Sequence, residues 1–150
     1  MQIKFQIFDD KQLLIQKFSG TFSLDIYTTY TGFLTQNFDL SHVTKVLIDF
    51  RNINFDNKLP GLKQEVNKVA DFRKKIEHKD MKRANVKRLF WVDKPLPTVV
   101  VQMFLRKSNS QSHSFCSSLK SALLYLDLKN DEIDLENLIK NLEHIYCIDS

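Results

Sequence analysis

VLIDFRNINFDNK, residues 46–58, is the segment around which the fold can be assembled. It opens with Val46, Leu47 and Ile48, a continuous apolar run of the kind that occurs in strands covered on both faces. The run breaks off into charged and amide side chains. The segment therefore predicts a strand in the centre of a sheet, over residues 45–50, with a polar edge at its carboxyl end.

The residues before this strand predict a hairpin and a helix. Residues 2–8 alternate between polar and apolar side chains, and a second apolar segment over 13–18 follows the turn-prone residues 9–11. Two antiparallel strands are expected there. Ser23 suits the cap of a helix over residues 24–38, although the run of Tyr and Thr within it also favours a strand by intrinsic propensity.

The residues after this strand predict alternating helices and strands. An amphipathic helix over 60–76 is followed by a strand over 86–92. Residues 98–106 fit a strand by their three valines and a helix by the spacing of their apolar side chains. A brief apolar pair at 115–116 then precedes a helix over 117–126.

The clearest helical pattern lies near the end of the chain. Asp134 is placed to cap a helix, and apolar side chains then recur at spacings of three and four: Leu135, Leu138, Ile139, Leu142, Ile145 and Tyr146. We expect this helix to pack on its own sheet or to form a homodimer interface, because either arrangement buries the same apolar stripe.

The predicted fold class is α/β in a single domain spanning residues 1–150. A chain of this length can bury a core without a metal or a disulfide, and its three Gly and three Pro leave little room for a linker. The order of elements predicts a mostly parallel sheet that is opened by an antiparallel hairpin and covered by helices. An extra amphipathic helix occupies the extension over residues 129–150.

The net charge of +4 is unevenly distributed. Residues 63–88 carry ten Lys or Arg against four acids, whereas residues 127–150 carry seven acids against two Lys. The basic segment attracts phosphate, but acids dilute it and no aromatic stacking motif interleaves it. A solvated helix face is therefore a simpler interpretation than nucleic-acid binding.

The cysteines and the first residues predict the compartment. Cys116 and Cys147 lie 31 positions apart, outside any metal-binding spacing, in a chain that is large enough to fold without a disulfide. The first residues lack the apolar core of a secretion signal, and no apolar stretch approaches the ~20 residues that span a bilayer. We therefore expect reduced thiols in a cytoplasmic protein without a membrane span.

The residue types that usually carry chemistry are scattered along the chain. The four histidines form no HExxH or paired arrangement, the three glycines start no phosphate-binding loop, and no GxSxG turn is present. The sequence therefore predicts a non-catalytic protein with no catalytic residue, no metal and no cofactor.

A polar rim is the candidate site. Ligands of open α/β sheets bind beyond the carboxyl ends of the strands, and polar side chains follow two of the predicted strands there: Asp49, Arg51, Asn52, Asn54, Asn57, Lys58, Asp93 and Lys94. One interpretation is a small polar site or a protein-docking edge. The alternative is a solvated strand end, in which Asp49 pairs with Arg51, or Asp93 with Lys94, at the surface.

Four segments resemble the STAS superfamily, the sulfate-transporter and anti-sigma-factor-antagonist domains. They are similar to its second strand and first helix, its central strand, its next strand, and its last short strand and helix, in that order: LLIQKFSGTFS (13–23), VLIDFRNINFD (46–56), RLFWVDKP (88–95) and SFCSSLKSALLYL (114–126). The resemblance covers about residues 1–128 and is to the stand-alone, anti-anti-sigma-like bacterial proteins. It implies the α/β topology described above.

The chain departs from this family at its regulatory position. Antagonists of the family are switched by phosphorylation of a serine just after the central strand, where this chain has Asn57 or Lys58. No Ser, Thr or Tyr occurs from Lys45 to Pro97, so nothing there can accept a phosphate. The phosphorylation switch is therefore not expected to operate in this chain.

Two functions fit this pattern. The first is a regulatory module that docks a protein partner on the polar rim, with the basic helix steering association. The second is a module that binds a small ligand or a lipid in an apolar cleft between sheet and helices, because stand-alone relatives of this kind also look similar to CRAL-TRIO lipid-transfer domains.

Overall fold

The computed structural model describes residues 1–55, 59–79, 85–129 and 134–147. Its strands are β1 (Gln2–Phe8), β2 (Leu13–Thr21), β3 (Lys45–Asn54), β4 (Lys87–Trp91), β5 (His113–Cys116) and β6 (His144–Cys147). Its helices are α1 (Leu24–Asn37), α2 (Leu59–Lys79), α4 (Pro95–Ser108), α5 (Leu119–Tyr125) and α6 (Leu135–Lys140), and a short 3-10 turn, Asp9–Lys11, joins β1 to β2.

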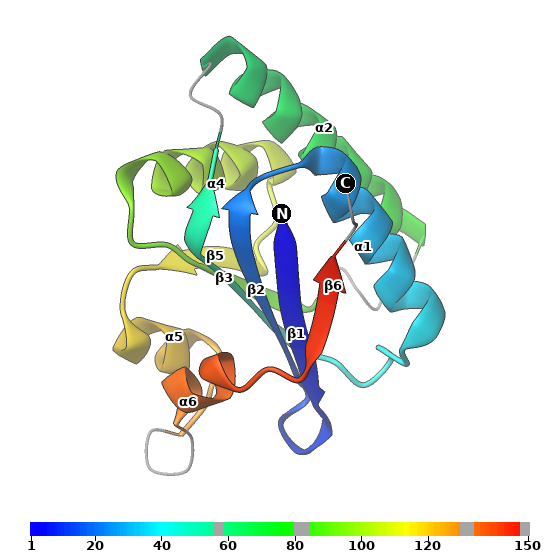
Figure 1. The fold of residues 1–150 in the computed structure, drawn as a ribbon, viewed down its shortest axis with the longest axis vertical. Helices are drawn as coiled ribbons and strands as arrows, with labels where there is room; N and C mark the ends of the chain where they lie inside the picture. Colours follow the sequence, from blue (N-terminus) through cyan, green and yellow to red (C-terminus); the bar gives the residue numbers. More distant parts are fainter. Residues whose placement is uncertain (56–58, 80–84, 130–133, 148–150) are drawn as a thin grey trace.

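The strands form one mixed sheet in the order β5-β4-β3-β2-β1-β6. Figure 1 shows β6 beside β1 at one edge of this sheet. Strands β2, β3, β4 and β5 pair in parallel, whereas β1 is antiparallel to both of its neighbours, β2 and β6. The expected α/β class and opening hairpin are therefore confirmed. β6 is an addition that the sequence did not predict.

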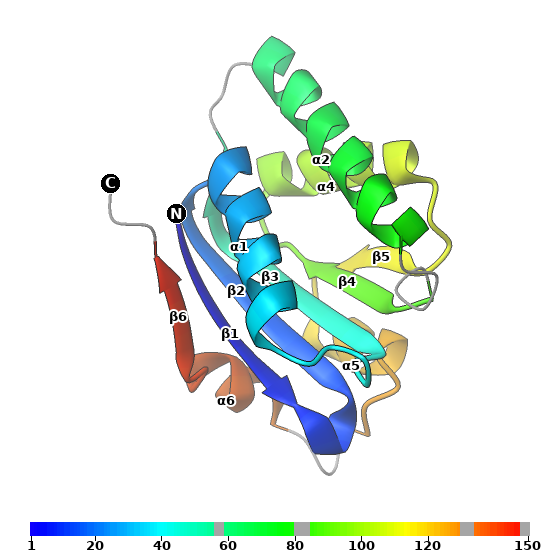
Figure 2. The same cartoon turned by 90° about the vertical axis from the view of Figure 1, so that its right-hand side faces the viewer.

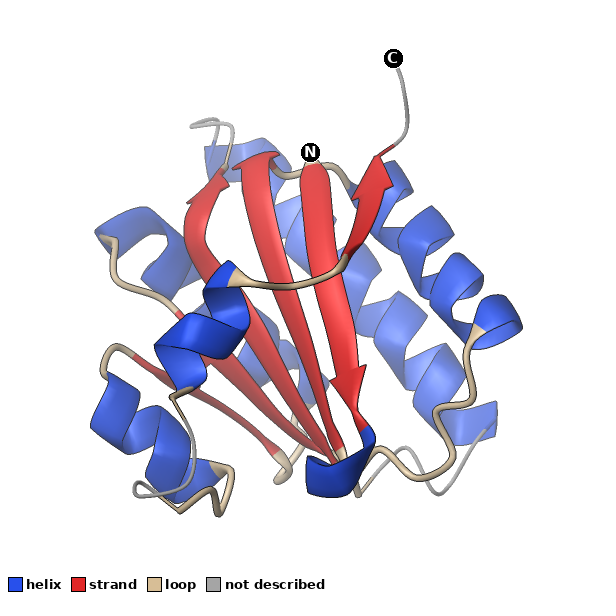
Figure 3. Cartoon of the chain, turned by 60° about the horizontal axis from the view of Figure 1, so that its bottom comes forward, coloured by secondary structure: helices blue, strands red, loops and turns tan. Residues whose placement is uncertain are grey.

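Helices cover the sheet on both faces. Figure 2 shows α1, α2 and α4 on one face, and Figure 3 shows α5 and α6 in front of the other. Strand β3 contributes to both cores, because Val46 and Ile48 are buried under the first set of helices and Leu47 is buried under the second. The prediction of a central strand covered on both faces is confirmed.

Strand β3 extends to Asn54, four residues beyond the predicted end. Its register with β2 shifts between the pairs Lys17–Asp49 and Ser19–Asn52, so two residues of β3 face one residue of β2. Such a bulge changes the direction in which later side chains point. Ile53 is consequently buried on the face of α1, α2 and α4, whereas Leu47 and Asp49 face α5 and α6.

Helix α1 forms despite its Thr-rich sequence. The Ser23 side chain accepts a hydrogen bond from the backbone N–H of Ile26 and caps the helix, as predicted. The Thr31 hydroxyl donates to the Tyr27 carbonyl at 2.8 Å, within the same helix. Burial of Tyr30 and Leu34 on the sheet then outweighs the strand propensity of the segment.

Helix α4 resolves the ambiguity over residues 98–106. Pro95 lies in its first turn, where the missing N–H of proline has no intrahelical partner to lose. Val100, Val101 and Phe104 are buried on the sheet-facing side of this helix, which is the apolar spacing of a helix rather than of a strand.

The predicted helical extension is wrong in its second half. Asp134 caps α6 as expected, but the helix ends at Lys140 and residues 144–147 form β6. β6 satisfies backbone groups along the outer edge of β1, and the Tyr146 ring packs 5.3 Å from that of Tyr30. Ile145 is exposed on the opposite side, so the two side chains predicted to share one helical stripe point apart.

The apolar stripe of α6 packs on the sheet of its own chain. Leu135 and Ile139 are buried in the core beneath α5 and α6, together with Leu142. The prediction of packing on the same chain is therefore confirmed for α6.

We expect Leu135→Ala to lower the free energy of unfolding by roughly 2–5 kcal/mol, because it would leave a cavity in this core. Leu124→Ala is the matched control, since Leu124 is 79% exposed. Urea denaturation followed by circular dichroism measures both. Equal stabilities of the two variants would contradict the packing of α6.

Candidate functional site

The structure divides the predicted polar rim into separate environments. Asn57 and Lys58 lie outside the described residues. Asn52 and Asn54 are exposed on β3, and Asp93 and Lys94 are exposed after β4. Asp49 and Arg51 instead point toward α5 and α6.

Asp49 and Arg51 form a buried ion pair. The Asp49 side chain is 1% exposed, and its Oδ1 accepts hydrogen bonds from the backbone N–H of Arg51 at 3.0 Å and from Arg51 Nε at 2.9 Å. Its Oδ2 accepts from Arg51 Nη2 at 2.9 Å. The carboxylate therefore satisfies an amide in the bulge of β3 and orients the guanidinium.

The same guanidinium joins the sheet to α6. Arg51 Nη1 donates to Glu136 Oε1 at 2.8 Å, Nη2 donates to Oε2 at 3.2 Å, and the guanidinium carbon lies 4.0 Å from the centroid of the Trp91 ring. The hydrogen bonds to Asp49 raise the pKa of Arg51, burial opposes this, and Glu136 adds to the rise. We call Asp49, Arg51, Trp91 and Glu136 the clamp, because they fix α6 on the sheet.

The clamp differs from both interpretations of the rim. Asp49 and Arg51 do pair, but they pair inside the protein rather than at a solvated strand end. The sequence pointed to neither Glu136 nor Trp91 as their partners, because Glu136 follows Arg51 by 85 positions and an acid in a first helical turn has an ordinary explanation in the helix dipole.

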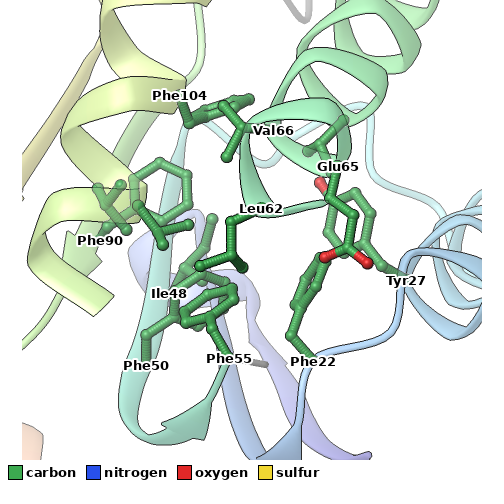
Figure 4. Close-up of a pocket in the computed structure, with 13 residues that line it drawn as sticks. Phe22, Tyr27, Ile48, Phe50, Phe55, Leu62, Glu65, Val66, Phe90 and Phe104 are labelled. Carbon is green, nitrogen blue, oxygen red and sulfur yellow. The ribbon is translucent and has the colours of Figure 1, made fainter. Parts of the chain in front are cut away.

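An apolar cleft lies on the opposite face of the sheet (Figure 4). It separates α2 and α4 from β3 and β4 and is lined by Phe22, Tyr27, Ile48, Phe50, Phe55, Leu62, Glu65, Val66, Val69, Phe90, Val100, Val101 and Phe104. Its empty volume is about 550 Å³ including the part that opens to solvent, whereas the space for the centres of water-sized molecules is about 40 Å³. The cleft is therefore narrow and partly open.

The cleft lies near the carboxyl ends of β3 and β4. Phe50 belongs to the last part of β3 and Phe55 follows that strand directly, with 6.2 Å between their ring centroids. Phe22 comes from the β2–α1 connection, and its ring centroid is 5.3 Å from that of Phe55. Aromatic side chains thus form much of the wall at the position where α/β sheets usually hold ligands.

Glu65 is the charged residue among the described cleft-lining side chains. Figure 4 shows its carboxylate extending from α2 toward the side of the cleft that Phe22 and Tyr27 form. None of the site residues that were predicted from the sequence and that the structure describes lines this cleft. The signal that was available is the spacing Leu62, Glu65, Val66, Val69, which puts the acid within the apolar stripe of α2.

Comparison of the chain with protein-family models, with curated proteins and with solved structures gave no match. Among the described helices, none has the length and apolar content needed to cross a bilayer. The side chains described in residues 1–55, 59–79, 85–129 and 134–147 bring together no group of three or more His, Cys, Asp or Glu suited to a metal ion.

We expect Arg51→Ala to destabilise the protein by about 3–5 kcal/mol, because it leaves the Asp49 carboxylate buried without a counter-charge. Arg106→Ala on the exposed last turn of α4 is the matched control and should change stability by less than about 0.5 kcal/mol. Urea unfolding provides the comparison. Similar effects of the two substitutions would show that the clamp contributes little.

The two thiols should differ in reactivity. Burial raises the pKa of Cys116 to about 11, so its thiol stays protonated at pH 8, whereas Cys147 is exposed. Because the thiolate is the reactive form, we expect a thiol-exchange reagent to modify about one thiol per chain quickly at this pH. Cys147→Ser should abolish the fast phase and Cys116→Ser should retain it. A fast phase that persists in Cys147→Ser would contradict the burial of Cys116.

Proposed function

We propose that this protein is a non-catalytic binding module that takes a small apolar ligand into the cleft between its sheet and helices α2 and α4. The observation that carries the proposal is the cleft itself. Its wall is almost entirely apolar, it is partly open to solvent, and it lies near the carboxyl ends of parallel strands.

The apolar wall supplies the driving force for binding. Each methylene group of a ligand that leaves water contributes about 0.8 kcal/mol, and an eight-carbon chain therefore gains roughly 6 kcal/mol before the cost of association is subtracted. Because about 6 kcal/mol alone corresponds to a dissociation constant of about 40 μM and the cost of association must be subtracted from it, a neutral alkyl ligand should bind in the millimolar range or more weakly. Widening of the cleft on binding would require movement of side chains such as Val66 and Phe104.

Docking of a protein partner on the polar rim stays a prediction. Of the six rim residues that the structure describes, Asn52, Asn54, Asp93 and Lys94 are exposed and remain candidates. The charges of Asp49 and Arg51 are engaged in the clamp. We therefore give the apolar cleft precedence over the rim.

We also propose a STAS-like topology for the core. An antiparallel hairpin that leads into parallel strands β2, β3, β4 and β5, with a helix in each crossover, supports it. The chain lacks the phosphorylatable serine of that family, and ligand binding in the cleft does not depend on one.

We expect 1-octanol to bind the native chain with saturation at one molecule per chain, as measured by isothermal titration calorimetry. Val69→Phe places a larger side chain in the lining of the cleft and should weaken binding at least about ten-fold. Val99→Phe is the matched control on the exposed side of α4, where Val99 is 46% exposed. Circular dichroism verifies that both variants are folded.

Two results would contradict the proposed function. One is the absence of saturable octanol binding by the native chain. The other is equal affinity of the folded Val69→Phe and Val99→Phe variants, which would place the bound octanol elsewhere.

A further inference from the structure

Glu65 is out of place in an apolar wall. It lies on α2 between Leu62 and Val66, both buried, and its own side chain is half-buried. Among the residues that the structure describes, none forms a hydrogen bond or an ion pair with its carboxylate. A neutral ligand that filled the cleft would remove water from this charge without supplying a counter-charge.

The surroundings of Glu65 suit a positive charge. Aromatic faces attract cations within about 6 Å of the ring centroid, and the wall near Glu65 is formed by Phe22 and Tyr27, whose centroids are 6.1 Å apart (Figure 4). The chain already uses one of these rings in this way, since the Arg73 guanidinium lies 5.5 Å from the centroid of Tyr27. A carboxylate beside aromatic rings combines two sources of attraction for a cation.

We infer that the ligand of the cleft is a cationic amphiphile, an alkyl or aryl ammonium compound. Its ammonium group would lie against Glu65, Phe22 and Tyr27, and its apolar part would lie along the wall that Phe50, Phe90 and Phe104 form. This inference rests on the proposed function and adds the chemical class of the ligand.

The other ligand classes fit this wall less well. An anionic amphiphile would place its head group beside a carboxylate, and like charges repel. A neutral alcohol can donate one hydrogen bond to the carboxylate but supplies no positive charge. Lys63 and Lys68, on the exposed side of α2, weaken the local negative potential at long range, but salt screens exposed charges more than it screens a half-buried contact.

Three probes of equal chain length test the inference on the native chain: octyltrimethylammonium, 1-octanol and octyl sulfate, each below its micelle-forming concentration. Isothermal titration calorimetry at two salt concentrations should give octyltrimethylammonium an affinity about ten-fold above that of octanol, and octyl sulfate the weakest binding. This comparison requires no substitution and so does not depend on the folding of a variant.

Two substitutions then locate the preference. Glu65→Gln should reduce the ammonium-over-octanol ratio to near unity while octanol affinity stays the same or rises. Asp71→Asn is the matched control, because it removes the same charge from an exposed position of α2 and should preserve the ratio. Phe22→Leu keeps an apolar side chain but removes the ring. It should lower the ammonium-over-octanol affinity ratio by roughly a few-fold and change the affinity for octanol less.

The outcomes separate this inference from the proposed function. If no probe binds with saturation, both fail. If octanol binds and Val69→Phe weakens it, but octyltrimethylammonium binds no tighter than octanol, the cleft remains a ligand site and the cationic class is wrong. A preference that survives Glu65→Gln also overturns the inference, because the head group would then lie away from this carboxylate.

Discussion

Burial of β3 on both faces is the constraint on which the rest of this structure depends. Ile48 and Phe50 are buried on one face of the sheet, beneath α1, α2 and α4. Leu47 is buried on the other face, beneath α5 and α6. Polar side chains toward the end of the strand must then be satisfied internally or reach solvent. Asp49 and Arg51 are satisfied in the clamp, and Phe50 lines the cleft. Because successive side chains of β3 point to opposite faces of the sheet, the clamp lies on one face and the apolar cleft lies on the other.

The sequence predicted the elements whose signals are local. Three kinds of signal depend only on residues that are close together in the sequence: the apolar run of β3, the Ser23 and Asp134 caps, and the apolar stripe of α2. Each of these features is found in the structure. The segment around Ile145 and Tyr146 was predicted incorrectly, because its helical spacing is also compatible with a short strand. Pairing with the outer edge of β1 selects the strand over the helix, and β1 is distant from this segment in the sequence.

The candidate sites could be predicted only in part. Asp49 and Arg51 were found because they follow an apolar strand, but their role depends on Glu136, whose position beside them follows from the packing of α6. The wall of the cleft combines residues from strands and helices that are far apart in the sequence. The cleft therefore cannot be predicted until the positions of the crossover helices on the sheet are known. Glu65 appeared to be one of the acids that dilute a basic segment, although its spacing from Leu62 and Val66 placed it on the buried stripe.

The pairing of β6 with β1 has a consequence for the order of folding. These strands join residues as far as 145 positions apart, whereas β1 and β2 are linked by a single short turn. The entropy lost in closing a chain segment grows with its length, and that loss precedes the gain from the contacts it creates. β6 is therefore expected to pair with β1 after the rest of the sheet has formed.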